Sequence, residues 1–74
     1  MKFIEEMIQV ILTQHDVKGT YTFSCTVTER DDDYLVLCST EIEGKKAGVS
    51  LPITKELQKA LSLPTEDFEL TVTV

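Results

Sequence analysis

Two cysteines are the residues whose chemistry depends most directly on where the fold places them. Cys25 and Cys38 are predicted to occupy opposed positions on neighbouring strands. Two thiols in that arrangement come within range of a disulfide bond, and they could also contribute to a metal site. The chain has no CxxC motif, however, and two thiolates alone do not complete a zinc site. The sequence therefore favours a reduced pair of small apolar side chains in the core, and it predicts no metal site.

A run of acidic residues follows the first predicted strand. A calcium-binding loop needs alternating ligands, a glycine in mid-loop and a distal glutamate, and this run lacks that spacing. We expect a solvated hairpin tip, a position at which loops often carry binding function. With the acids near the next turn, the run gives the candidate partner-binding residues Glu29, Asp31, Asp32, Asp33, Glu41 and Glu43.

His15 is the single histidine of the chain and lies beside Asp16. A general base needs a cleft and an oriented partner, and adjacent residues rarely provide that geometry. The chain also lacks a GxSxG nucleophile motif and a glycine-rich phosphate loop. The sequence therefore predicts no catalytic residues and no cofactor, and we expect a protein that is not an enzyme.

Hydrophobic periodicity predicts the elements that position these residues. Apolar residues recur at helical spacing near the N-terminus. A second helix is expected to be capped by Thr54 and stopped by Pro64. Its apolar stripe would comprise Ile53, Leu57, Ala60 and Leu61. Alternation of apolar residues with Thr and Ser is typical of strands, and Pro52 is expected to end the third strand. The predicted ranges are a helix over 2–14 and strands over 20–29, 34–42, 47–51 and 67–74.

These elements predict one two-layer α+β domain with the order α-β-β-β-α-β. The sheet is expected to be four-stranded and mostly antiparallel, with both helices on one face. An even loop at the first hairpin brings the apolar residues of both strands to that face. The pairs that this register predicts are Cys25 with Cys38, Val27 with Val36, and Tyr21 with Ile42.

The second turn and the last strand complete the predicted sheet. A four-residue loop at the second turn sets Ile42 opposite Ala47 and Cys38 opposite Leu51. The last strand is predicted to lie beside the first and parallel to it, after a right-handed crossover through the second helix. We expect it in the interior of the sheet rather than at an edge, where its backbone could pair with another chain.

The sheet face turned away from the helices is predicted to be rich in threonine. The threonines expected there are Thr20, Thr22, Thr26, Thr28, Thr71 and Thr73. Leu35 and Leu37 fall among them. Two leucines on a smooth polar sheet indicate a contact surface, whereas stray apolar residues on a wetted face are the other interpretation. We take Leu35 and Leu37 as candidate self-association residues of a homodimer.

The chain has 74 residues and a net charge of −6, with a pI near 4.5. That length provides for one domain, and 42% hydrophobic residues are enough for a folded core. The acidic balance argues against direct nucleic-acid binding, because such proteins gather Lys and Arg against the phosphates. We expect neither a signal peptide nor a membrane-spanning stretch, which favours a cytoplasmic location.

The segment VSLPITKELQKALSLPTED resembles the swapped-hairpin family of bacterial transition-state regulators and antitoxins. The matching elements are Leu51-Pro52, Leu57, Ala60-Leu61, Ser62-Leu63 and Asp67, in about a quarter of the chain. The resemblance implies a strand–helix–strand unit and DNA binding. The chain departs from the family where the helix starts two residues late after Pro52 and where Glu66 replaces a glycine. Its first strand is rich in threonine, whereas the family has basic residues there.

Three functional hypotheses follow. The first is a small, acidic, non-enzymatic binding or regulatory protein that acts by protein–protein contact. The second is an acidic inhibitor of the kind encoded by phages, whose carboxylates would occupy the nucleic-acid site of an enzyme. The third is the DNA-binding regulator or antitoxin that the resemblance implies.

Overall fold

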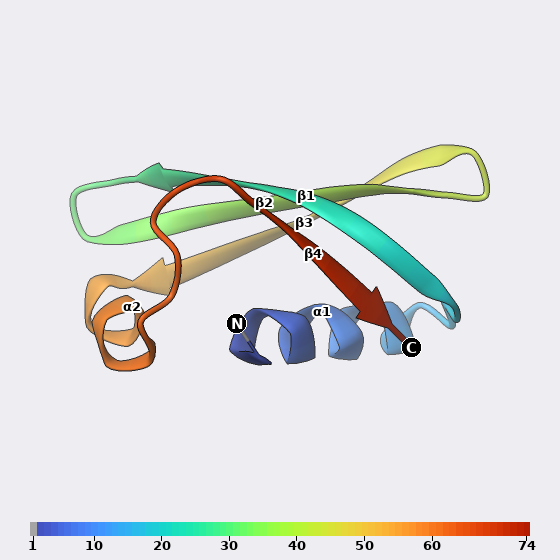
Figure 1. The fold of residues 1–74 in the computed structure, drawn as a ribbon, viewed down its shortest axis with the longest axis horizontal. Helices are drawn as coiled ribbons and strands as arrows, with labels where there is room; N and C mark the ends of the chain where they lie inside the picture. Colours follow the sequence, from blue (N-terminus) through green and yellow to red (C-terminus); the bar gives the residue numbers. More distant parts are fainter. Residues whose placement is uncertain (1) are drawn as a thin grey trace.

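The computed structural model describes residues 2–74 and has the predicted α+β architecture. A four-stranded sheet in the order β3-β2-β1-β4 forms one layer, and two helices lie on one of its faces (Figure 1). All neighbouring strands are antiparallel. The elements are α1 (Lys2–Gln14), β1 (Thr20–Glu29), β2 (Asp33–Ile42), β3 (Lys45–Thr54), α2 (Lys55–Leu61) and β4 (Phe68–Thr73).

The core lies between the helices and the face of the sheet that we call the inner face. On α1, the buried residues Ile4, Ile8 and Leu12 recur at helical spacing. Alternate strand residues complete the core, among them Phe23, whose side chain is 1% exposed. α1 lies against β4, whereas α2 lies against β2 and β3. Burial of these apolar side chains supplies most of the folding free energy of so small a domain.

The first hairpin has the predicted register in the half that lies next to its turn. The pairs of Cys25 with Cys38 and of Val27 with Val36 are both confirmed. The predicted pair of Tyr21 with Ile42 is not formed. β1 pairs with β2 only from Ser24 onward, and Tyr21 pairs with Val72 of β4.

The second turn is shorter than the sequence pattern predicts. Glu43 and Gly44 alone connect the strands, so the expected pairs Ile42–Ala47 and Cys38–Leu51 are wrong by two positions. The observed pairs are Ile42–Lys45, Thr40–Ala47, Cys38–Val49 and Val36–Leu51. Both turn residues have positive φ, 53° and 76°, as in the type I′ turn that matches the twist of a hairpin. A shift of two positions keeps every side chain on its predicted face.

Pro52 lies inside β3. The sequence pattern predicts instead that Pro52 ends this strand. Pro52 pairs with Leu35, and the strand continues to Thr54. Proline is tolerated in an edge strand where its missing N–H would face away from the neighbouring strand. Thr54 then caps α2 as predicted, because its hydroxyl accepts a hydrogen bond from the N–H of Leu57 at 3.1 Å.

α2 is shorter than its apolar pattern indicates. It ends at Leu61, and Ser62 follows with a left-handed φ of 51° before Pro64. Ala60 and Leu61, expected on the apolar stripe, are exposed, and Leu63 is buried instead. The left-handed cap turns the chain back toward the core one residue beyond the helix.

β4 lies beside β1 as predicted, but it is antiparallel to β1 and forms an edge of the sheet. The prediction of a parallel, interior strand is therefore wrong. A helix of seven residues spans only about 10 Å, so it does not return the chain to the other end of the sheet. β4 starts at the end where β3 stops and runs back along β1 (Figure 1).

Candidate functional site

The outer face of the sheet, opposite the helices, has a consistent chemical character. Its residues are Lys46, Gly48, Ser50 and Pro52 on β3, Leu35, Leu37, Ser39 and Glu41 on β2, Thr20, Thr22, Ser24, Thr26 and Thr28 on β1, and Glu69, Thr71 and Thr73 on β4. Hydroxyl side chains dominate this face. Its charged groups stand at the two ends of β2 and β3, on Glu41 and Lys46 at one end and on Asp33 at the other, or on the β4 edge, on Glu69.

Leu37 lies in the uncharged part of the outer face, as predicted. Leu37 is 44% exposed, whereas Leu35 is half-buried. Across the sheet, Leu37 is flanked by Thr26 and Ser50. We use the name leucine patch for Leu35, Leu37 and their cross-strand neighbours Thr26, Thr28, Ser50 and Pro52. A shallow hollow of about 410 Å³ opens beside it, with Leu37, Gly48 and Ser50 among its lining residues.

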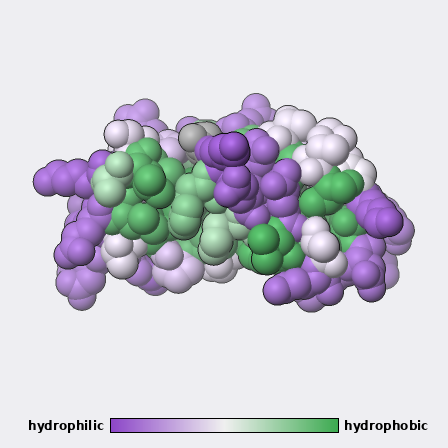
Figure 2. All heavy atoms as spheres, turned by 90° about the horizontal axis from the view of Figure 1, so that it is seen from below, coloured by the Kyte–Doolittle hydropathy of each residue, from purple (hydrophilic) through white to green (hydrophobic). Residues whose placement is uncertain are grey.

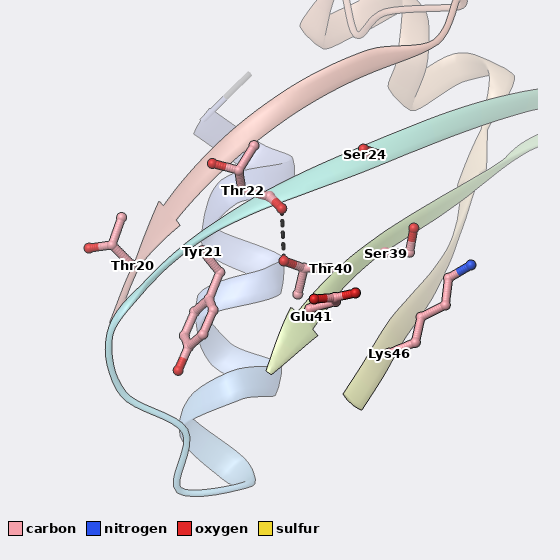
Figure 3. Close-up of a pocket in the computed structure, with 8 residues that line it drawn as sticks. All are labelled: Thr20, Tyr21, Thr22, Ser24, Ser39, Thr40, Glu41 and Lys46. Atoms are coloured by element: carbon pink, nitrogen blue, oxygen red, sulfur yellow. Dashed lines mark hydrogen bonds between the residues drawn. The ribbon is translucent and has the colours of Figure 1, made fainter. Parts of the chain in front are cut away.

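The sheet forks at one end. β1 and β2 pair from Ser24–Ser39 toward the first hairpin turn, but beyond that pair β1 bonds to β4 alone and β2 to β3 alone. Figure 3 shows this opening, which is crossed by a hydrogen bond from the Thr40 hydroxyl to the Thr22 carbonyl at 2.8 Å. The fork holds a polar hollow of about 530 Å³. Nothing in the sequence pattern predicts it, because the alternation on β1 continues through Tyr21.

The six candidate acidic residues are divided between the two ends of β2. Glu29 and Asp31–Asp33 lie at the first hairpin turn, whereas Glu41 and Glu43 lie at the second. A strand of ten residues separates these ends by about 30 Å. The structure therefore places the six carboxylates in two groups, one at each end of β2.

Two of these carboxylates are paired with cations. Asp33 accepts two hydrogen bonds from the guanidinium of Arg30, both at 2.6 Å. These bonds lower the pKa of Asp33 below its ordinary value. Glu29 accepts from the ammonium of Lys55 at 2.9 Å, which raises the pKa of Lys55. Both pairs are solvent-exposed, so they order the first hairpin turn without contributing much to stability.

Cys25 and Cys38 face each other on the inner face, and both are free thiols. Their residues are 2% and 1% exposed. Burial raises the pKa of both thiols, so they stay protonated and are poor nucleophiles. The pair therefore belongs to the packed core in this state.

His15 follows α1 and is exposed. It lines a hollow of about 310 Å³ whose other walls are apolar, with Ile11, Phe23 and Val49 among them. No carboxylate, hydroxyl or thiol of the described residues lines this hollow beside it. Within residues 2–74, the structure has no cluster of three or more His, Cys, Asp or Glu side chains arranged for a metal ion.

The helical side of the molecule is less uniform than the outer face. Figure 2 shows hydrophobic atoms there in separate patches with hydrophilic atoms between them. The large apolar residues exposed on the helices are Met7, Val10 and Leu61. The exposed apolar residues of this side therefore belong to two different helices.

Comparison with models of protein families, with curated proteins and with solved structures finds no match to this chain. In the segment that resembles the swapped-hairpin family, β3 and β4 lie at opposite edges of the sheet. Asp67 accepts a hydrogen bond from the N–H of Val27 at 3.0 Å, just before β4 begins. None of the described helices is long and apolar enough to cross a membrane.

Proposed function

We propose that this protein is a non-enzymatic binding protein that contacts a protein partner through the leucine patch on the outer face. One observation carries the proposal. A residue as apolar as Leu37 stays 44% exposed in a small acidic domain, on a face whose other side chains are short and mostly uncharged. Removing Leu37 from water on binding is favourable.

The side chains around Leu37 favour this use. Thr26, Thr28 and Ser50 are short, and a threonine on a strand has few rotamers to lose. Ordering these side chains in an interface therefore costs less entropy than ordering long charged ones. Their hydroxyls donate and accept hydrogen bonds at the rim of the apolar centre. The partner that fits is a flat surface with an apolar centre and polar groups around it.

The two free, buried cysteines support a reducing compartment, because disulfides are rare where thiols are kept reduced. A cytoplasmic regulatory protein is therefore the class that we propose. Its action would be to occupy or present a surface.

Comparative capture from the native cell extract tests the proposal. Tagged wild-type protein is compared with Leu37→Lys, which places a charge at the centre of the leucine patch. The matched control is Val10→Lys, because Val10 is 55% exposed but lies on α1. We expect a specific protein to be recovered at stoichiometric levels with wild type and Val10→Lys but to be lost with Leu37→Lys.

Circular dichroism first establishes that both variants fold. Recovery of the same proteins in equal amounts with Leu37→Lys would exclude the leucine patch as the binding surface. Loss with both variants would attribute capture to general exposed hydrophobicity.

A further inference from the structure

The free edge of β3 has backbone groups that face solvent. Gly19 and Val74 exchange both backbone hydrogen bonds at 2.9 Å, so they form a bonded pair between the ends of β1 and β4. In antiparallel sheets hydrogen-bonded and non-hydrogen-bonded pairs alternate along the strands. The backbone N–H and C=O groups of odd residues of β1 therefore point toward β4, and those of even residues point toward β2. The same alternation holds on β2 and β3. It directs the backbone N–H and C=O groups of the even residues of β3 away from the sheet.

Three consecutive even residues of β3 are therefore available as donors and acceptors: Lys46, Gly48 and Ser50. All three are exposed, and β3 is the outermost strand on its side. Pro52 falls in the same outward series. Its lack of an N–H explains why a proline is accommodated at this point of the strand.

The opposite edge, on β4, is protected. β4 has six residues against ten in β3. The amide of Gln9 on α1 donates to the outward carbonyl of Thr73 at 3.1 Å, and Glu69 places a charge on that edge. Such devices are typical of edges that must not pair with other chains. On β3 the comparable devices, Lys46 and Pro52, stand toward the two ends of the strand, whereas its middle carries Gly48 and Ser50. That middle part is the more accessible of the two edges.

We infer that β3 pairs antiparallel with β3 of a second copy of this chain, centred on Gly48, to form a continuous eight-stranded sheet. A two-fold axis at Gly48 sets the two Gly48 residues opposite each other and Lys46 opposite Ser50 of the second copy. Each of these pairs has both N–H groups and both carbonyls facing the other strand. The edge is therefore complementary to itself, which an isologous dimer requires.

Pro52 disfavours registers whose axis is shifted toward the end of β3. Shifting the axis to Val49 or Ser50 would set Pro52 opposite Lys46 or Gly48, where a carbonyl would meet a ring with no N–H. With the axis at Gly48, Pro52 lies beyond the last paired residue. On the inner face the same register places Val49 beside Ala47 of the second copy. Both residues are half-exposed, so the apolar inner face continues across the axis.

The occupant is a second copy because the outward groups of Lys46, Gly48 and Ser50 are complementary to themselves about Gly48. The paired segment of residues 45–51 spans about 23 Å, which is less contact than a permanent dimer has. We therefore expect reversible association with a dissociation constant of about 100 µM. The edge shares Ser50 and Pro52 with the leucine patch, but it pairs through backbone groups and does not include Leu37, so the variants at Leu37 and Gly48 test the two proposals separately.

Two variants of opposite charge at position 48, measured alone and as a mixture, test the pairing. Gly48→Glu and Gly48→Lys each place like charges directly opposite one another across the axis, which opposes pairing. A side chain fits there in the monomer, since an added Cβ would meet its nearest neighbour, the Cys38 carbonyl oxygen, at 3.7 Å. By sedimentation equilibrium we expect each variant alone to associate at least tenfold more weakly than wild type. An equimolar mixture should regain association as a heterodimer.

Two further variants locate the contact. Glu69→Lys changes the charge of the β4 edge, so it should leave association unchanged. Leu37→Lys distinguishes the faces, because association that is lost with Leu37→Lys but kept with both Gly48 variants would assign it to the leucine patch and overturn the inference. Wild-type protein that stays monomeric at about 1 mM would also overturn it, as would a mixture of the Gly48 variants that does not associate.

Amide exchange gives an independent measurement on the unmodified chain. The outward amides of Lys46, Gly48 and Ser50 should exchange rapidly in dilute protein. Their exchange should slow as the concentration rises through the dissociation constant, while exposed turn amides such as Gly44 do not change. Equal exchange of the β3 amides at low and high concentration, with association still present, would place the contact elsewhere.

Discussion

The two faces of this sheet are made by alternate residues of the same strands, yet they serve different purposes. On β1, Phe23 is 1% exposed whereas its neighbours Thr22 and Ser24 are exposed. On β2, Cys38 is 1% exposed and Leu37 is 44% exposed. The inner face supplies the burial that folds the chain. The outer face contributes little to that burial, so its side chains can be changed with less effect on stability.

The largest expected loss of stability comes from a substitution at the centre of the inner face. Phe23→Ala should reduce the free energy of unfolding by about 3–5 kcal/mol, because it removes a buried ring and leaves a cavity. Thr26→Ala, on the outer face of the same strand, should change it by less than about 0.5 kcal/mol. Urea denaturation followed by circular dichroism measures both. Similar losses for the two variants would contradict the division of the faces.

A smaller effect is expected from the buried thiols. Cys38→Ser buries a hydroxyl in place of a thiol, and we expect a loss of about 1–3 kcal/mol. Ser50→Ala is the outer-face control and should be close to neutral. Thermal unfolding should show a lower midpoint for Cys38→Ser by about 4–8 °C for each kcal/mol lost. An unchanged midpoint would mean that position 38 is not sealed from water.

The cap of α2 tests how the inner face is covered near the end of β3. None of the residues of α2 is fully buried, so the helix depends on its ends more than α1 does. Thr54→Ala removes the hydroxyl that accepts from Leu57 and should cost about 1 kcal/mol. Thr65→Ala, an exposed position beyond the helix, is the control. A loss no greater than that of the control in urea denaturation would show that tertiary contacts alone hold α2.

The smallest effect concerns the ion pair at the first hairpin turn. The hydrogen bonds from Arg30 lower the pKa of Asp33 below 3.8. A lowered carboxyl pKa contributes stability above the unfolded value, and that contribution is lost as the pH falls through the folded value. In Arg30→Gln the pKa of Asp33 should rise toward 3.8, as followed by NMR titration of its carboxyl carbon. In Lys59→Gln, on α2, it should remain at the wild-type value.

The alternation of apolar and polar residues was sufficient to predict the faces of the sheet. It placed Cys25 opposite Cys38 and Leu37 outside, because both follow from a period of two residues and an even loop. The same period cannot distinguish a two-residue from a four-residue turn, since both keep each side chain on its face. The signal that decides the second turn is Glu43-Gly44, whose glycine suits the positive φ of a type I′ turn.

Features that depend on three-dimensional closure were not predictable in this way. The direction of β4 follows from the short span of α2 rather than from the pattern of β4 itself. The fork arises because β1 changes its bonded partner near Ser24, from β2 to β4, while its alternation continues unchanged. The sequence pattern does not show that β3 continues through Pro52, because a proline is tolerated there only if β3 is an edge strand.

The fork also divides the domain into parts that differ in cooperativity. Between Ser24 and Glu29, β1 belongs to a ladder whose buried side chains connect to both helices, so that part opens only with the whole domain. The far end of the β2–β3 hairpin is bonded to β1 through the hydroxyl of Thr40, and its turn lies in solvent. Ile42 and Val49 of that end also pack against the core. We therefore expect this end of the hairpin to open before the rest of the sheet, and each opening to expose those two apolar side chains.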